Sequence, residues 1–199
     1  MLSYRADMLL MIGGGSSVGK TTVAHELGRR LGADVIDVDA LPRDRAVGLD
    51  GRLSEPGIWD RPPSNLFQLL LETTRGLAPR LRATIEARSL AVEGAVVEGE
   101  GIEPRLFDAF EAGAQVRPVF VIETDPHRLR ETLSHRVSRG AELFRRLTST
   151  EQGHVVEMNV LYARWLGEEA RVRGLPCVES QPWPDLGDRI LAAAHAPMS

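Results

Sequence analysis

The chain has 199 residues, with 24 basic and 28 acidic side chains and a net charge of −4. This acidic balance argues against general nucleic-acid binding, which needs a basic surface to meet phosphates. No apolar run approaches the roughly 18 residues that cross a bilayer, and the single cysteine excludes a disulfide framework. We therefore expect a cytoplasmic protein, monomer or homodimer, that binds neither nucleic acid nor membranes.

The predicted elements alternate along the chain between strands and helices. Strands are expected at 8–12, 34–38, 94–98, 116–122 and 176–179, and helices at 20–31, 65–93, 126–139, 150–173 and 185–195. Gly76 and Pro79 are the points where the second helix could break. The pattern predicts an α/β fold: a five-stranded parallel sheet with helices on both faces. We expect one domain over 1–199, with 40–63 as a substrate-side insertion and about 136–150 as a lid.

The strongest motif follows the first predicted strand. Its residues fit G-x-x-x-x-G-K-[ST] at every fixed position and are followed by a further threonine: Gly14, Gly15, Ser16, Ser17, Val18, Gly19, Lys20, Thr21 and Thr22. Such a loop turns its N–H groups toward phosphates at the positive end of the next helix. Lys20 can reach the β- and γ-phosphates, and the Thr21 hydroxyl can bind Mg²⁺. The motif predicts ATP and Mg²⁺ as cofactors, within a P-loop NTPase fold.

Lysine usage narrows the chemistry, because Lys20 is the only lysine in the chain. Guanine-specific switches use an Asn-Lys-x-Asp signature, and protein kinases need a strand lysine outside the phosphate loop. Neither lysine is present here. Remodelling ATPases usually end the corresponding strand in Asp-Glu, whereas this one ends in Val97-Glu98-Gly99. Among the P-loop proteins considered, the small-molecule kinases therefore remain. We expect a P-loop NTPase fold of the nucleoside and metabolite kinase type.

Carboxylates stand where predicted strands end, which is where ligands bind in such sheets. Glu98 is expected to hold Mg²⁺ together with Thr21. Asp37 and Asp39 end the second strand; we favour Asp39 as the base that accepts a proton from the substrate hydroxyl, although a capping or solvated role is open. Glu100, in the turn after Glu98, is placed beside the acceptor.

Arginines and one tryptophan complete the predicted site. Arg43 and Arg45 suit a carboxylate or phosphate on the acceptor, and Arg136 and Arg139 suit a lid that closes over the transferring phosphoryl. All four also fit ordinary surface charges. Trp59, in the insertion, either covers the substrate or anchors the insertion to the core.

These motifs resemble the 2-phosphoglycerate kinase-like P-loop kinases. The resemblance rests on the loop from Gly13 to Thr22, on Asp39 followed by Arg43, on Val97-Glu98-Gly99, and on the late helix that runs into Gly174-Leu175-Pro176. It implies an adenylate-kinase-like core, ATP with Mg²⁺, and a small phosphorylated acid as acceptor. The 39–63 insertion has no counterpart in that group.

Two functions follow from the sequence. The first is a Mg²⁺-dependent phosphotransferase that phosphorylates a hydroxyl or a phosphate of a small, anionic metabolite. The alternative is a nucleotide-binding sensor or partner-binding protein that occupies ATP without a soluble acceptor. Acceptor-stimulated ADP release distinguishes the two.

Overall fold

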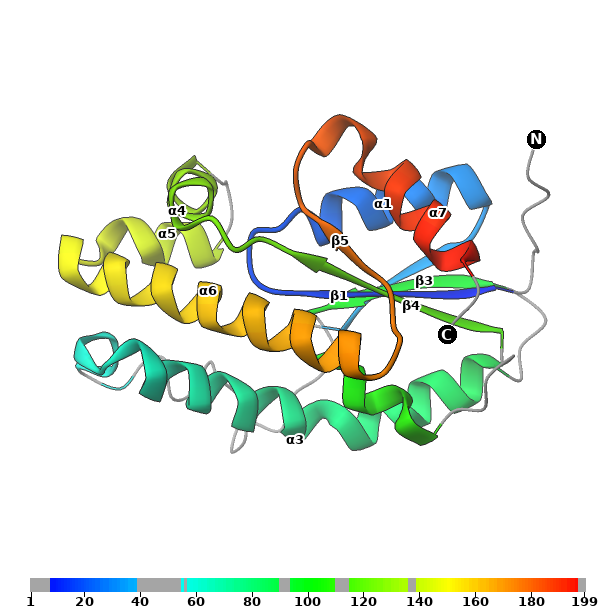
Figure 1. The fold of residues 1–199 in the computed structure, drawn as a ribbon, viewed down its shortest axis with the longest axis horizontal. Coiled ribbons are helices and arrows are strands. Elements are labelled where there is room, and N and C mark those ends of the chain that lie inside the picture. The colour runs from blue at the N-terminus through cyan, green and yellow to red at the C-terminus, as the bar shows by residue number, and fades with distance from the viewer. Residues whose placement is uncertain are drawn as a thin grey trace.

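A computed structural model of the chain describes residues 8–38, 55, 57–89, 94–109, 115–135 and 139–196. Its centre is a five-stranded sheet in the order β2-β3-β1-β4-β5, in which every pair of neighbours is parallel (Figure 1). The strands are β1 (Leu9–Gly14), β2 (Asp34–Asp37), β3 (Ala95–Gly99), β4 (Val116–Ile122) and β5 (Cys177–Glu179). The predicted α/β fold is confirmed, and β1 lies between β3 and β4, where the strand order reverses.

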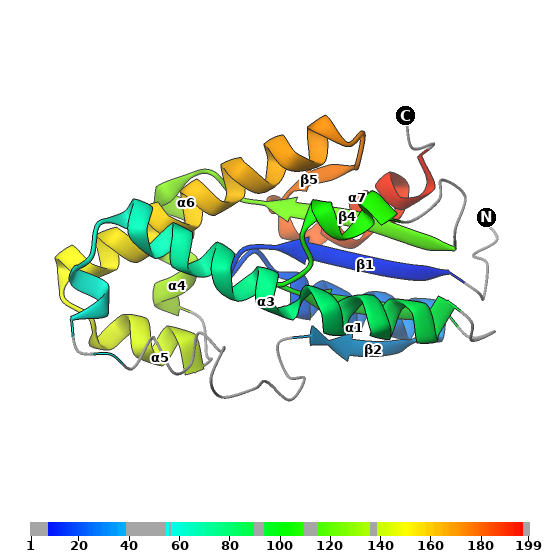
Figure 2. The ribbon, with the colours of Figure 1, turned by 90° about the horizontal axis from the view of Figure 1, so that it is seen from below.

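Helices cover both faces of this sheet. One face carries α1 (Lys20–Leu31) and α7 (Leu186–His195), and the other carries α3 (Pro63–Ser89) and α6 (Ser149–Val172) (Figures 1 and 2). Two shorter helices, α4 (Pro126–His135) and α5 (Arg139–Arg146), lie beyond the carboxyl ends of the strands (Figure 1). Short 3₁₀ helices span Ile58–Asp60, Pro104–Ala109 and Trp183–Asp185. None of the described helices is both long and apolar enough to cross a membrane.

Alternation along the strands sends side chains into two cores. Leu10 and Ile12 pack with Val96 beneath α1 and α7, whereas Met11 and Val97 pack on the side of α3 and α6. All five are essentially inaccessible to solvent, and burying each such side chain contributes about 1.5–3 kcal/mol. Burial on both faces explains why these strands are continuous apolar runs rather than alternating ones.

Helix α3 differs from the expectation, because it continues through Gly76 and Pro79. Pro79 removes one N–H from the helix ladder, which normally kinks or ends a helix. Packing outweighs that cost here: Leu81 and Ile85, on the carboxyl side of the proline, are both 1% exposed in the core. The break predicted at these residues is therefore wrong.

The region after β4, where a helix is predicted over 126–139, contains two described helices. They are α4 (Pro126–His135) and α5 (Arg139–Arg146), and residues 136–138 between them lie outside the described residues. Leu129 and Leu133 of α4 pack with Phe144 of α5 in a third apolar cluster, which also includes residues of α6. These apolar contacts pack α4 and α5 against α6.

Local signals fix the beginning of α6. The Thr148 hydroxyl accepts a hydrogen bond from the Glu151 N–H at 3.3 Å, and the Glu151 carboxylate accepts one from the Thr148 N–H at 2.7 Å. This reciprocal pair is a capping box. The Glu151 carboxylate also accepts a hydrogen bond from the Thr148 hydroxyl, and this bond, with the one from the Thr148 N–H, lowers the pKa of Glu151 below its ordinary value. Further along α6, Asn159 and Tyr162 lie beside Gly15 of the loop that follows β1.

Candidate functional site

The loop between β1 and α1 has a sharply curved backbone. Gly14 and Gly19 have φ values of 154° and 92°, and Ser17 has φ 65°. A β-carbon on Gly14 would lie 2.5 Å from the carbonyl oxygen of Val121, so only glycine fits there. Ser17 is a non-glycine residue in the left-handed region, which costs energy and is found most often at functional sites. Val18 anchors the loop, because its side chain is buried in the core under α1.

Lys20 begins α1 directly beneath this loop. Its side chain is 7% exposed, and its ammonium donates a hydrogen bond to the carbonyl oxygen of Gly15 at 2.6 Å. In the described chain no side chain caps the amino end of α1, and its first turn has no acidic residue. The positive end of a helix with no carboxylate of its own favours an anion. The loop from Gly14 to Gly19, with Lys20 and the first turn of α1, therefore has a geometry suited to phosphate; we call it the phosphate cradle.

Two carboxylates stand side by side at the carboxyl ends of β2 and β3. Asp37 and Glu98 are register partners in these parallel strands, and Glu98 also pairs with Ile12 of β1. Side chains two residues apart on a strand share a face, so Glu98 points with Val96 toward the α1 layer. Glu98 is 1% exposed. A carboxylate in this position lies on the same side of the sheet as the first turn of α1.

Oxygen ligands suited to magnesium therefore gather on the α1 side of the sheet. Thr21 is half-buried in the first turn of α1, next to Lys20, and its hydroxyl and the Glu98 carboxylate are groups that Mg²⁺ accepts. The described residues contain no group of three or more His, Cys, Asp or Glu side chains that could hold a metal by themselves. The residues present fit a Mg²⁺ that keeps several ligands from phosphates and water.

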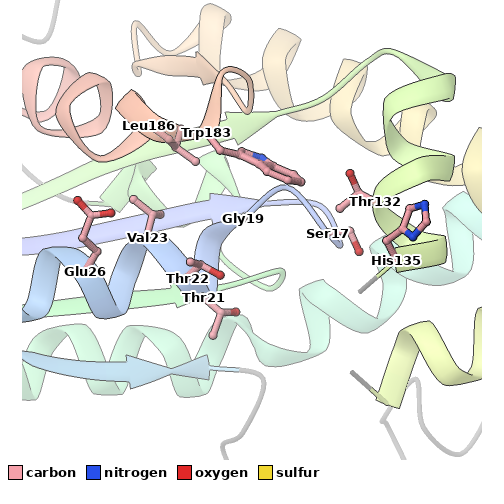
Figure 3. A pocket seen from close by; sticks show the side chains of 10 residues that line it. All are labelled: Ser17, Gly19, Thr21, Thr22, Val23, Glu26, Thr132, His135, Trp183 and Leu186. Carbon is pink, nitrogen blue, oxygen red and sulfur yellow. The ribbon is translucent and has the colours of Figure 1, made fainter. Parts of the chain in front are cut away.

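A pocket of about 340 Å³ opens beside the phosphate cradle (Figure 3). Trp183, just before α7, extends over it toward Thr132 and His135 of α4. The indole nitrogen lies 3.6 Å from the position of a β-carbon built on Gly19. The lining residues are Ser17, Gly19, Thr21, Thr22, Val23, Glu26, Thr132, His135, Trp183 and Leu186. An exposed aromatic face beside a phosphate cradle is suited to stack on a planar base.

On the opposite side of the cradle, α6 contacts both the loop and the turn after β3. The Tyr162 hydroxyl donates a hydrogen bond to the carbonyl oxygen of Glu100 at 2.7 Å. A β-carbon on Gly15 would lie 3.5 Å from the Tyr162 ring and 3.7 Å from the amide oxygen of Asn159. The half-buried Glu100 is thus joined through α6 to the phosphate loop.

Sequence reasoning missed Glu123, a 4% exposed carboxylate just beyond β4. It accepts hydrogen bonds from the Ser180 hydroxyl at 2.7 Å and from the Asp125 N–H at 3.0 Å. These bonds join the turn after β4 to the end of β5. The available signal was the same as for Glu98, an acid directly after a run of apolar residues. Asn159 and Tyr162 were also missed, and no motif in α6 could have revealed them.

The remaining predicted residues fall into two groups. Trp59 is half-buried and packs against two apolar clusters, and its carbonyl oxygen lies 2.9 Å from Nδ1 of His154 in α6. This arrangement fits the anchoring interpretation; that Trp59 covers an acceptor stays a prediction. Four predicted residues lie outside the described residues: Asp39, Arg43, Arg45 and Arg136. Arg139 begins α5, but its side chain is not among those described.

No protein-family model and no curated protein matches the sequence. Solved structures do resemble it. One is a gluconokinase from Sinorhizobium meliloti 1021, with 17% identity and a TM-score of 0.54, covering 96% of this chain and 93% of that one. Another is a shikimate kinase from Acinetobacter baumannii in complex with shikimate, with 15% identity and a TM-score of 0.51, covering 92% and 90%. The chain has the fold of the P-loop kinases.

Proposed function

We propose that the protein is an ATP-dependent phosphotransferase that phosphorylates a hydroxyl, or a phosphate, of a small anionic metabolite. The observation that carries this proposal is the complete phosphate cradle, with the buried Lys20 beneath it and the buried Glu98 at the end of the neighbouring strand. The two similar solved structures are named as kinases of small molecules, which supports the same class for this chain.

The described residues of the candidate site have distinct roles in this proposed reaction. The loop N–H groups and Lys20 hold the β- and γ-phosphates, and Thr21 and Glu98 hold Mg²⁺ with its water ligands. When bound, the metal neutralises charge on the phosphates. The base stacks on Trp183 in the neighbouring pocket. Catalysis of this kind comes from positioning and from charge stabilisation rather than from a covalent intermediate.

The acceptor side is completed by residues that the sequence predicts. Asp39, with Asp37 beside it, orients the acceptor hydroxyl and takes its proton. Arg43 and Arg45 bind the anionic group, Trp59 and Glu100 lie beside the substrate, and Arg136 and Arg139 close over the phosphoryl from a lid at about 136–150. We place the acceptor among small phosphorylated acids, as in the 2-phosphoglycerate kinase-like group, and the protein in the cytoplasm as a monomer or homodimer.

ADP release in the presence of a panel of hydroxylated acids and sugar acids tests the proposal. We expect one chemical class of acceptor to stimulate release well above the rate with ATP and Mg²⁺ alone. Slow release that no acceptor changes would instead support the sensor, the alternative that the sequence leaves open.

Asp39→Asn should lose acceptor phosphorylation and keep ATP binding, whereas unchanged phosphorylation would remove Asp39 from the role of base.

A further inference from the structure

Asn159 has a buried hydrogen-bonding atom that the fold leaves unused. The residue lies in the middle of α6 and is 2% exposed. Its Nδ2 donates a hydrogen bond to the carbonyl oxygen of Val155 at 2.8 Å. This bond fixes the orientation of the amide, because a flipped amide would set its oxygen against another carbonyl oxygen. Within the described part of the chain, the buried Oδ1 has no hydrogen-bond donor.

A buried carbonyl oxygen without a donor is costly and rare in folded proteins. A leucine would fill a similar volume without that cost, so packing alone does not account for an asparagine here. Groups of this kind that destabilise a fold are found at sites where function requires them. The question is therefore which donor Oδ1 faces.

Oδ1 faces the phosphate loop. A β-carbon on Gly15 would lie 3.7 Å from it, and glycine at this position leaves the loop backbone open to the amide. The Tyr162 hydroxyl, the other polar group of α6 near this contact, already donates to Glu100. Lys20 donates to the carbonyl oxygen of Gly15 itself. The donors that the loop can turn toward Oδ1 are its backbone N–H groups and its serine hydroxyls.

We propose that Asn159 is a positioning residue for the phosphate loop. In the nucleotide-bound conformation its Oδ1 accepts a hydrogen bond from the Gly15–Ser16 segment, donated by a backbone N–H or by the Ser16 hydroxyl, and so holds the loop closed around the phosphates. This inference rests on the proposed function only in requiring that the loop bind nucleotide. The loop needs such support, because Ser17 keeps it in a left-handed backbone conformation.

Asn159→Leu tests the proposal, with two measurements that should move in different directions. Binding of ADP with Mg²⁺, followed by calorimetry, should weaken about three- to tenfold, the worth of one hydrogen bond. The melting temperature of the free protein should stay the same or rise, because the unpaired oxygen is gone. Asn159→Ala provides a second test of affinity should leucine pack badly.

Thr73→Val is the matched control. Thr73 is also buried in a helix and donates to the carbonyl oxygen four residues back, Leu69, at 2.9 Å, but it lies in α3 rather than in α6. The Thr73→Val variant should therefore bind ADP with the affinity of the wild type. Asn159 variants that melt at a lower temperature with unchanged ADP affinity would overturn the proposal and make the residue merely structural.

The outcome separates this inference from the proposed function. If the wild type binds ADP and transfers phosphoryl to no acceptor, the proposed function fails, and the affinity of Asn159→Leu still decides the role of Asn159. A wild type that binds no nucleotide overturns both.

Discussion

At the scale of single residues, Lys20 is held in place before any nucleotide arrives. Its ammonium is buried and hydrogen-bonded to the loop that it serves. A preorganised charge of this kind needs little rearrangement when the phosphoryl is transferred, and this is why such groups stabilise transition states strongly. As the chain has no other lysine, every other strongly basic side chain at the site must be an arginine, whose planar guanidinium binds carboxylates and phosphates in a different geometry.

Lys20→Ala should lower kcat/KM for phosphotransfer by about a hundredfold to a thousandfold or more, the usual effect of removing one preorganised donor. The fold should persist, as judged by circular dichroism. Arg29→Ala, an exposed cation in the same helix, is the control and should retain activity. Normal turnover in Lys20→Ala would remove the phosphate cradle from the reaction.

Cys177 predicts a pH dependence. Burial, with a smaller contribution from the Glu179 carboxylate, raises the pKa of this thiol to about 11, from an ordinary value of 9.0. Between these two values the unfolded chain loses a proton that the folded chain keeps, so stability falls as pH rises from about 9 to 11. Wild type should therefore lose stability relative to Cys177→Ala over this range in urea unfolding. Few other groups titrate there, since the chain has one lysine and two tyrosines. Parallel pH curves for the two proteins would contradict the assignment.

At the scale of elements, the site depends on how closely β1 approaches its neighbours. A β-carbon on Gly13 would lie 2.5 Å from the carbonyl oxygen of Ile102 and 2.7 Å from the Phe120 ring. The backbone of the segment after β3 therefore packs directly on β1, which brings the carboxyl ends of β1 and β3 together at the cradle. The backbone conformation of Gly13 would allow a side chain, but the Ile102 carbonyl oxygen and the Phe120 ring leave no room for one.

Gly13→Ala should destabilise the protein by about 1–3 kcal/mol or more, because backbone cannot move aside as a flexible side chain can. Gly32→Ala is the comparison: nothing lies within 4 Å of its added β-carbon, but its φ of +64° is strained for alanine. That strain costs about 1–2 kcal/mol. Urea unfolding should rank Gly13→Ala as the more damaging change, and the reverse order would mean that the contact with Ile102 can relax.

The 3₁₀ helix before α7 is expected to supply the surface for the base. Trp183→Ala should weaken ADP binding by about tenfold, since stacking of a base on an aromatic ring is worth about 1–3 kcal/mol. Val172→Ala, which removes exposed apolar surface at the far end of α6, should have no effect. Equal affinities for wild type and Trp183→Ala would move the base elsewhere.

At the scale of the whole molecule, the sequence predicted the sheet, its helices and the phosphate cradle, because each depends on local patterns. An apolar run such as 8–12 indicates a strand that is buried on both faces, and the G-x-x-x-x-G-K-[ST] spacing indicates a single phosphate-binding loop. The sequence could not predict that Asn159 and Tyr162 face Gly15, because contacts between elements that are distant in the chain leave no periodic signal in it. The continuity of α3 through Pro79 was missed for a related reason: tertiary packing outweighs local propensity.

The central claim is that the γ-phosphoryl of ATP passes to a small molecule. The most direct test follows the reaction by ³¹P nuclear magnetic resonance, with Mg²⁺, ATP and an acceptor that stimulates ADP release. We expect a new resonance of a phosphorylated product that grows as the γ-phosphate signal falls, and growth slower by about a hundredfold or more with Lys20→Ala. If inorganic phosphate were the only product, phosphoryl would be passing to water, and the protein would be a nucleotide hydrolase or sensor instead.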